Sequence, residues 1–185
     1  MTELAKVETP GGRRRTRRRK VILIGLLLLP AAGLLVSGAS RAVSIRAYNI
    51  PSGSMAPTLK AGDRVGVQTK PSDLPKRGEV WVFRMPPAAG TPGEGVKRII
   101  GLPGETVAVA GGVVLIDGVA LSEPNIPGPI SYEMPPRTLK PGEYFVLGDS
   151  RNSSHDGHVW GPLPADHLVG PVTMRYWPLR RVGGL

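Results

Sequence analysis

Residues 96–121 have the sequence VKRIIGLPGETVAVAGGVVLIDGVAL, and this stretch predicts the fold class. Short runs rich in valine and isoleucine occur at residues 96–100, 106–110 and 113–116. A Gly-Gly pair joins the second run to the third and an Asp-Gly pair follows the third, and both pairs are turn signals of antiparallel hairpins. Residues 106–121 are therefore predicted to form consecutive antiparallel strands.

The same alternation of short apolar runs and turn residues continues along the chain, which contains 25 glycines and 20 prolines. This dispersal favours an all-β domain of short antiparallel strands and tight turns. About 145 residues follow residue 40, which is enough chain for one compact domain with a core. Further strands are predicted at residues 64–69, 79–84, 144–147 and 169–176. Loops are predicted at the proline-rich residues 86–92 and 124–141.

Residues 21–40 carry no formal charge, and as a helix they would extend about 30 Å, the thickness of a bilayer core. They predict one N-terminal transmembrane helix. Residues 1–20 contain eight Lys or Arg against two acids and so carry +6 of the net charge of +10. Because a basic block beside an apolar span stays in the cytoplasm, residues 1–20 are predicted as a disordered cytoplasmic tail. A juxtamembrane link at 41–47 then leads to an extracytoplasmic β domain at 48–185.

Two alternatives exist for the N-terminal region. Ser37-Gly38-Ala39 is a small-x-small sequence that would suit a cleaved signal peptide. The uncharged stretch exceeds the roughly 7 to 15 residues of a usual signal core, which favours an uncleaved anchor. The arginine cluster from Arg13 to Lys20 could bind nucleic acid, but its place against an apolar span indicates a topology signal that touches anionic lipid. We therefore expect a membrane partner and no nucleic acid.

The composition also narrows the chemistry. There are no cysteines, so disulfides, thiolate metal sites and cysteine nucleophiles are excluded. The three histidines lack a metal-type spacing such as His-x-x-x-His, and no metal or other cofactor is predicted.

A serine in residues 51–59, PSGSMAPTL, is the candidate nucleophile. Ser54 lies between the flexible Gly53 and Pro57, whose ring fixes the backbone. A turn of this kind can present a hydroxyl instead of burying it in a regular strand.

A lysine in the strand predicted at residues 96–100 is the candidate base. Strand alternation places Lys97 on the face of Ile99 and opposite Arg98. A lysine that points with isoleucine into apolar surroundings loses its proton easily. Together with Ser54, Lys97 predicts a serine hydrolase whose base is a lysine.

Four motifs in this order resemble bacterial type I signal peptidases, the membrane-bound serine proteases that remove signal peptides from exported proteins. They are SGSMAPTL at 52–59, RGEVWVF at 77–83, KRIIGLPGE at 97–105 and GDSRNSSHD at 148–156. The second motif usually has Asp where Glu79 stands. The resemblance covers roughly residues 48–175 and implies a signal-peptidase-like fold.

The resemblance also implies roles for individual side chains. Ser54 matches the nucleophile and Lys97 the general base. The hydroxyl of Ser52, with the backbone N–H of Ser54, matches the oxyanion hole. Ser154 matches the serine that orients the lysine. These roles agree with the chemistry, because an amine accepts the serine proton only when neutral, and donors aimed at the oxyanion stabilise the tetrahedral intermediate.

Three charged residues, Arg98, Asp149 and Asp156, match family residues that brace the site. The last motif also departs from the pattern. Ser150 stands where asparagine is usual, and the usual Asp-Ser-Arg ending reads Asp156-Gly157-His158. Any ion pair expected of that arginine would fall to His158.

The histidines allow a second mechanism. His155, His158 or His167 could form a Ser-His-Asp arrangement with Asp149 or Asp156. We favour structural or surface roles for His155 and His158.

Substrate contacts follow from the resemblance as well. Ile50, Met55, Val82 and Val96 are ordinary core residues or, as the family implies, line shallow apolar pockets. Such pockets would accept small side chains at the first and third positions before the cut.

The predicted function is endoproteolytic removal of signal peptides from exported preproteins after Ala-x-Ala sites, by a Ser-Lys dyad. The predicted location is the cytoplasmic membrane of a bacterium, as a single-pass protein with its N-terminus in the cytoplasm. Tethering would suit a substrate that is itself membrane-held. The alternatives are a specialised conjugative-transfer or pilin-processing peptidase, and a catalytically silent membrane-anchored binding protein.

Overall fold

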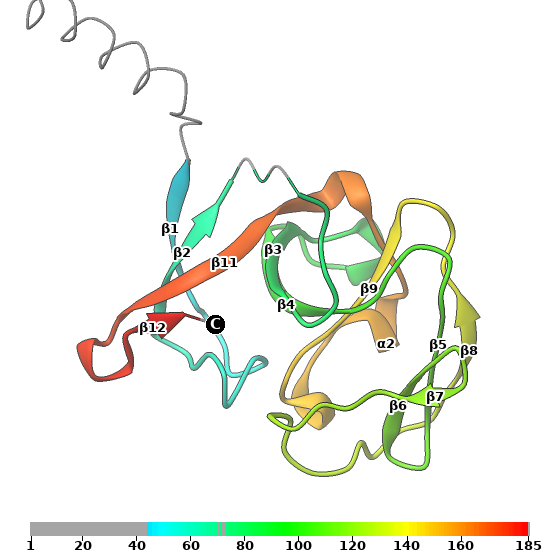
Figure 1. Ribbon diagram of the computed structural model, residues 1–185. Helices are drawn as coiled ribbons and strands as arrows, with labels where there is room; N and C mark the ends of the chain where they lie inside the picture. Colours follow the sequence, from blue (N-terminus) through cyan, green and yellow to red (C-terminus); the bar gives the residue numbers. More distant parts are fainter. Residues whose placement is uncertain (1–43, 70, 72, 185) are drawn as a thin grey trace, which may run out of the picture. The chain divides into compact units, whose positions relative to one another are not determined.

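A computed structural model describes residues 44–69, 71 and 73–184 (Figure 1). The tail predicted at 1–20, the transmembrane helix predicted at 21–40 and the first part of the predicted link lie outside these residues. Within the described ranges, no helix is both long enough and apolar enough to cross a membrane.

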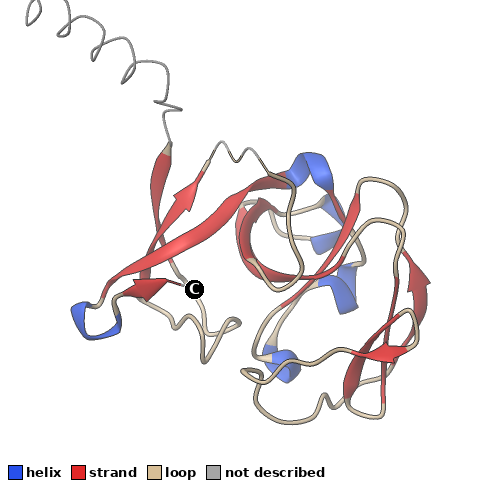
Figure 2. Cartoon of the chain, viewed as in Figure 1, coloured by secondary structure: helices blue, strands red, loops and turns tan. Residues whose placement is uncertain are grey.

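The described domain is all-β, as predicted, and its strands pair antiparallel (Figure 2). The larger sheet has eight strands in the order β1-β2-β11-β3-β4-β9-β10, with β12 paired to β11. Its strands are β1 Ile45–Asn49, β2 Arg64–Gln68, β3 Val80–Arg84, β4 Glu94–Gly101, β9 Glu143–Leu147, β10 Leu163–Pro164, β11 Leu168–Trp177 and β12 Gly183–Gly184.

The smaller sheet has four strands in the order β7-β6-β5-β8. Its strands are β5 Thr106–Ala110, β6 Val113–Ile116, β7 Val119–Ala120 and β8 Met134–Thr138. The turns predicted between residues 106 and 121 are confirmed, and Gly112 and Gly118 adopt the positive φ angles of 80° and 81° that these hairpins require.

Helices are few and short in the described part of the chain. They are the α-helix α2 Gly157–Trp160 and the 3₁₀ turns η1 Pro87–Ala89, η2 Arg151–Ser153, η3 Ala165–His167 and η4 Leu179–Arg181. The side chain of Asp156 caps α2 by accepting a hydrogen bond from the backbone N–H of His158.

The seven strands predicted from short apolar runs are confirmed, with shifts of at most two residues at their ends. Two predictions were wrong. Strand β1 begins at Ile45, inside the predicted link at 41–47, and β8 lies inside the predicted loop at 124–141. β1 is mostly exposed, and β8 contains two prolines, so neither has an alternating apolar pattern. Both are end strands of their sheets, where proline and polar residues are tolerated.

One of the three core clusters lies beneath the segment that contains Ser54. Ile50, Met55 and Leu59 are at most 3% exposed and pack with the buried valines of β2 and β3. Because three side chains of one short loop are buried, the loop is fixed relative to the larger sheet.

Candidate active site

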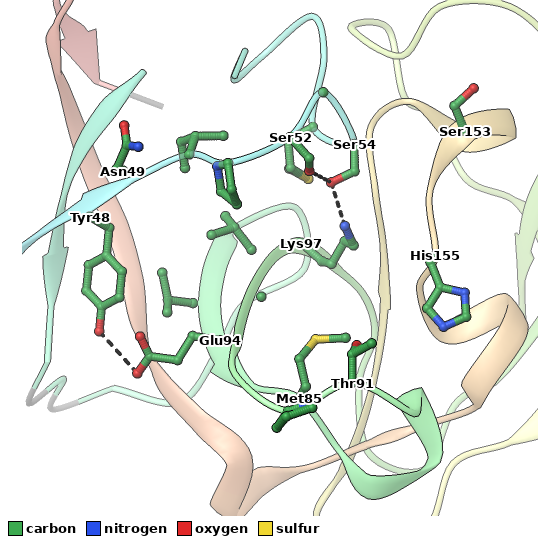
Figure 3. A pocket seen from close by; sticks show the side chains of 18 residues that line it. Tyr48, Asn49, Ser52, Ser54, Met85, Thr91, Glu94, Lys97, Ser153 and His155 are labelled. Atoms are coloured by element: carbon green, nitrogen blue, oxygen red, sulfur yellow. Dashed lines mark hydrogen bonds between the residues drawn. The ribbon is translucent and has the colours of Figure 1, made fainter. Parts of the chain in front are cut away.

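The candidate nucleophile and the candidate base, 43 residues apart in the sequence, meet in the structure. Lys97 Nζ lies 2.6 Å from Ser54 Oγ (Figure 3). Lys97 comes from β4 and is 7% exposed, whereas Ser54 comes from the loop that follows β1. The geometry allows direct proton transfer between the hydroxyl and a neutral amine.

The loop around Ser54 is held from both sides. Met55 directly follows the serine, and its side chain is buried in the core on one side of the loop. The backbone N–H of Ala56 donates to the carbonyl of Gly53 over 2.9 Å. From the opposite side, the backbone N–H of Ser150 donates to the carbonyl of Ser54 over 3.1 Å. The last of the four motifs therefore contacts the nucleophile through its backbone.

This contact depends on a glycine. A Cβ atom placed on Gly148 would lie 2.5 Å from the carbonyl oxygen of Ser54 and 2.2 Å from Ser154 Oγ. These separations are far below van der Waals contact. Only a residue without a side chain lets the 148–156 segment approach the nucleophile loop so closely.

Burial lowers the pKa of the candidate base. Desolvation by burial lowers the pKa of Lys97 and is the largest influence on it. The negative charges of Asp156 and then Asp149 act in the opposite direction and raise that pKa, without cancelling the effect of burial. The lowered pKa gives Lys97 a larger fraction of neutral amine than an exposed lysine has, and the neutral amine is the form that can accept a proton from Ser54.

The predicted oxyanion serine lies beside the nucleophile. Ser52 Oγ donates to Ser54 Oγ over 3.3 Å, and both side chains line the same cleft. A hydroxyl in this position is within reach of a carbonyl oxygen under attack by Ser54.

Ser154 lies near the pair, but the predicted bond to Lys97 is not formed in this arrangement. Its Oγ is buried and has no hydrogen-bond partner within residues 44–69, 71 and 73–184. Lys97 Nζ instead contacts Ser54, and Ser154 packs against Gly148.

Arg98 and Asp149, predicted as braces, form a partly buried ion pair. Arg98 Nε donates to Asp149 Oδ1 over 2.7 Å, and the Asp149 side chain is fully buried. Arg98 also donates to Thr58 Oγ1 over 3.2 Å and to the carbonyl of Gly78 over 2.6 Å. One guanidinium thus connects the loop after Ser54 to β4 and to the motif at 148–156.

The third predicted brace, Asp156, has two partners. Its Oδ2 accepts a hydrogen bond of 2.7 Å from the backbone N–H of Gly148, and its Oδ1 lies 2.8 Å from His158 Nδ1. The His158 ring is stacked on Tyr132 with 4.1 Å between ring centroids. His158 therefore makes the contact that the family pattern assigns to an arginine.

The other two histidines do not assemble a Ser-His-Asp arrangement. His155 lies in the cleft, but its Nε2 is 3.3 Å from the carbonyl of Ala89. His167 Nδ1 lies 2.9 Å from the carbonyl of Arg84. In the described part of the chain, no histidine forms a hydrogen bond with Ser54, and the geometry favours the lysine.

Ser54 and Lys97 line a cleft with a volume of about 780 Å³. The four residues predicted to line apolar pockets, Ile50, Met55, Val82 and Val96, all border this cleft, and Ile50, Met55 and Val82 are also core residues at most 3% exposed. Further lining residues that the sequence did not indicate are Tyr48, Asn49, Met85, Thr91, Glu94 and His155. Glu94 lies two residues before Val96 and so shares its face of β4, but only the approach of β1 near Tyr48 makes that position part of the cleft.

Across the residues that the structure describes, no group of three or more His, Asp or Glu side chains is arranged to hold a metal ion.

Comparison with known proteins gives consistent matches. The sequence model of the family described as signal peptidase, peptidase S26, matches residues 20–177. A signal peptidase I from Leptolyngbya laminosa is 39% identical over 169 residues, covering 88% of this chain and 80% of the relative. A probable signal peptidase I-2 from Synechocystis sp. is 40% identical over 159 residues, covering 80% of this chain and 73% of the relative. The solved structure of a signal peptidase I from Enterococcus faecalis matches 55% of this chain and 98% of its own, with 29% identity and a TM-score of 0.45.

Proposed function

The chain belongs to the signal peptidase family, peptidase S26, and from this premise we propose that Ser54 and Lys97 are the dyad with which it removes signal peptides. The chain is a serine endopeptidase, and its substrates are exported preproteins that carry signal peptides. The observation that carries the residue assignment is the 2.6 Å separation of Lys97 Nζ from Ser54 Oγ at the wall of the cleft.

The reaction begins with Lys97 neutral. As Ser54 Oγ attacks the scissile carbonyl carbon, its proton passes to Lys97 Nζ, and the carbonyl oxygen becomes an oxyanion. The Ser52 hydroxyl and the backbone N–H of Ser54 donate to that oxyanion. Lys97 then protonates the leaving amine, and the signal peptide stays bound to Ser54 as an ester. A water molecule, deprotonated by Lys97, hydrolyses the ester and regenerates Ser54.

Supporting residues keep this geometry. Arg98 and Asp149 hold the strand of the base against the nucleophile loop through the bonds described above. Asp156 positions the backbone at Gly148. For Ser154 we propose the role that the family resemblance implies, orientation of the Lys97 amine, through a hydrogen bond that is not formed in the arrangement described above.

The N-terminal sequence indicates where in the cell the reaction takes place. We propose that residues 21–40 anchor the protein in the bacterial cytoplasmic membrane, with residues 1–20 in the cytoplasm and the β domain outside. The basic block and the uncharged span support this topology. The anchor confines the enzyme to the surface on which its membrane-held substrates arrive.

Substrate size provides the direct test of this function. A synthetic signal peptide with alanine one and three positions before the cut should be cleaved. Phenylalanine at the position before the cut should lower kcat/KM by about a hundredfold, because a carbonyl displaced by about 1 Å from Ser54 reacts that much more slowly. The measurement is the initial rate in detergent, with both peptides at several concentrations.

The same experiment has a clear contrary result. Equal cleavage of the alanine and phenylalanine peptides would show that the wall formed by Ile50, Val82 and Val96 does not select small side chains.

The charge of Lys97 predicts the pH dependence. Only neutral Lys97 accepts the Ser54 proton, so kcat/KM should rise with pH through the pKa of Lys97 and then level off. Burial lowers that pKa, so the rise should occur at lower pH than the titration of an exposed lysine. Asp156→Asn removes the charge that most raises the pKa, and its profile should shift to lower pH. The measurement is kcat/KM from pH 5 to pH 10, and a shift to higher pH in Asp156→Asn would contradict the assignment.

A further inference from the structure

The cleft contains one carboxylate that the mechanism does not use. Glu94 is the only acidic side chain among the eighteen residues that line the cleft, where the other ionisable side chains on its wall are Tyr48, Lys97 and His155. Lys97 has to be neutral to act as a base. The carboxylate of Glu94 is therefore the acidic group that a bound peptide would meet on the wall of this cleft.

Glu94 lies at one end of the cleft, away from the reacting atoms. Figure 3 shows Glu94 and Tyr48 on one side of the Ser54–Lys97 pair, with His155 on the opposite side. Glu94 is three residues before Lys97 on β4, which corresponds to about 10 Å along a strand. The Tyr48 hydroxyl donates to Glu94 Oε1 over 3.5 Å, so residues from β1 and β4 meet at this end.

The backbone beside Glu94 can accept an extended peptide. β4 pairs with β3 from Glu94 to Arg98, but its pairing with β9 on the other edge begins only at Arg98. Residues 94–97 of β4 thus have an edge that no described strand covers, and β1 is an end strand of the same sheet. An extended peptide adds to such edges through its main chain, while its side chains are selected by the walls.

The two arginines near Glu94 have other hydrogen-bond partners. Arg46 donates to the Tyr48 hydroxyl over 3.4 Å, and Arg84, opposite Glu94 in β3, donates to the carbonyl of Asp166. Within residues 44–69, 71 and 73–184, Glu94 forms no ion pair. Its carboxylate remains available to a group on a bound peptide.

We propose that Glu94 is a specificity-determining residue that favours a basic side chain, and disfavours an acidic one, four or five residues before the cleaved bond. This inference rests on the proposed function. The pocket residues Ile50, Val82 and Val96 receive the substrate positions just before the cut. A peptide that continues along β4 at about 3.3 Å per residue then reaches Glu94 with its fourth or fifth side chain.

The test compares peptides that differ only in lysine, glutamine or glutamate at these two positions. At low salt the parent enzyme should cleave the lysine peptide about 3 to 10 times faster, in kcat/KM, than the glutamate peptide, as expected for exposed charges. Glu94→Gln should remove the preference and Glu94→Lys should reverse it. Asp166→Asn, which removes an exposed carboxylate outside the cleft, should leave it unchanged. A high salt concentration should weaken it.

Peptide binding to a Ser54→Ala variant separates this inference from the catalytic proposal. If the alanine peptides are cleaved but charge at these positions has no effect, or if the preference survives in Glu94→Gln, the role of Glu94 is overturned and the dyad stands. If no peptide is cleaved but the lysine peptide binds more tightly than the glutamate peptide, the dyad fails and the role of Glu94 stands. Absence of both cleavage and charge-selective binding overturns both.

Discussion

Lys97→Arg should abolish turnover, with a loss in kcat of at least about 10³-fold. Arginine keeps the positive charge and much of the length of lysine, but its guanidinium does not deprotonate at working pH. It therefore cannot accept the proton from Ser54, whose Oγ lies 2.6 Å from the lysine amine. The measurement is the initial rate on one signal peptide, after circular dichroism has shown that the variant is folded.

The histidines provide the matched controls. His155→Ala should retain the chemistry, because the ring contacts the carbonyl of Ala89 and not the nucleophile. His158→Ala should also turn over, with at most a looser frame around Asp156. An active Lys97→Arg enzyme, or a folded His155→Ala enzyme without activity, would overturn the lysine as the base.

Two opposing effects set the reactivity of this lysine. Burial in the wall of the cleft lowers its pKa, whereas Asp149 and Asp156 raise it. Both acids are fully buried. Asp149 accepts a hydrogen bond from Arg98, and Asp156 accepts one from the backbone N–H of Gly148, near Ser54. The acids that oppose the neutral lysine thus also build the site, and burial has to outweigh them.

The turn residues made much of the fold predictable. Gly-Gly at 111–112 and Asp-Gly at 117–118 placed β5, β6 and β7 because those turns require positive φ angles. Strand alternation also predicted correctly that Lys97 shares the buried face of β4 with Ile99, since Ile99 is fully buried and Lys97 nearly so. These are local properties of the chain.

The missed features depend on contacts between distant segments. β1 and β8 are edge strands held by backbone pairing, which leaves no apolar periodicity to detect. Glu94 reaches the cleft because β1 and β4 meet near Tyr48, 46 residues away in the sequence. The position of Ser154 relative to Lys97 depends on how the 148–156 segment packs against the loop of Ser54, which no local pattern encodes.

The largest effect expected from a single methyl group is at Gly148. Gly148→Ala should lower kcat by about a hundredfold or more, because the new Cβ would displace the Ser54 carbonyl or the 148–156 segment by a substantial part of 1 Å. A Cβ there would lie only 2.5 Å from that carbonyl oxygen, which belongs to backbone and cannot rotate away. The variant should also lose about 1 to 3 kcal/mol of stability, as overpacked sites do.

Gly170→Ala is the control that separates a loss of stability from a displacement of Ser54. A Cβ on Gly170 would lie 1.9 Å from the carbonyl oxygen of Gln68, where β11 meets the end of β2. That variant should unfold at a lower temperature but keep its kcat when assayed where it is folded, because Gly170 does not line the cleft. The measurement is kcat for both variants well below their melting temperatures, with melting followed by circular dichroism.

Gly148→Ala should lose activity even while folded, since its clash is with the residue that attacks the substrate. A folded Gly148→Ala enzyme with the kcat of the parent would mean that the close approach of the 148–156 segment to Ser54 is not needed for catalysis.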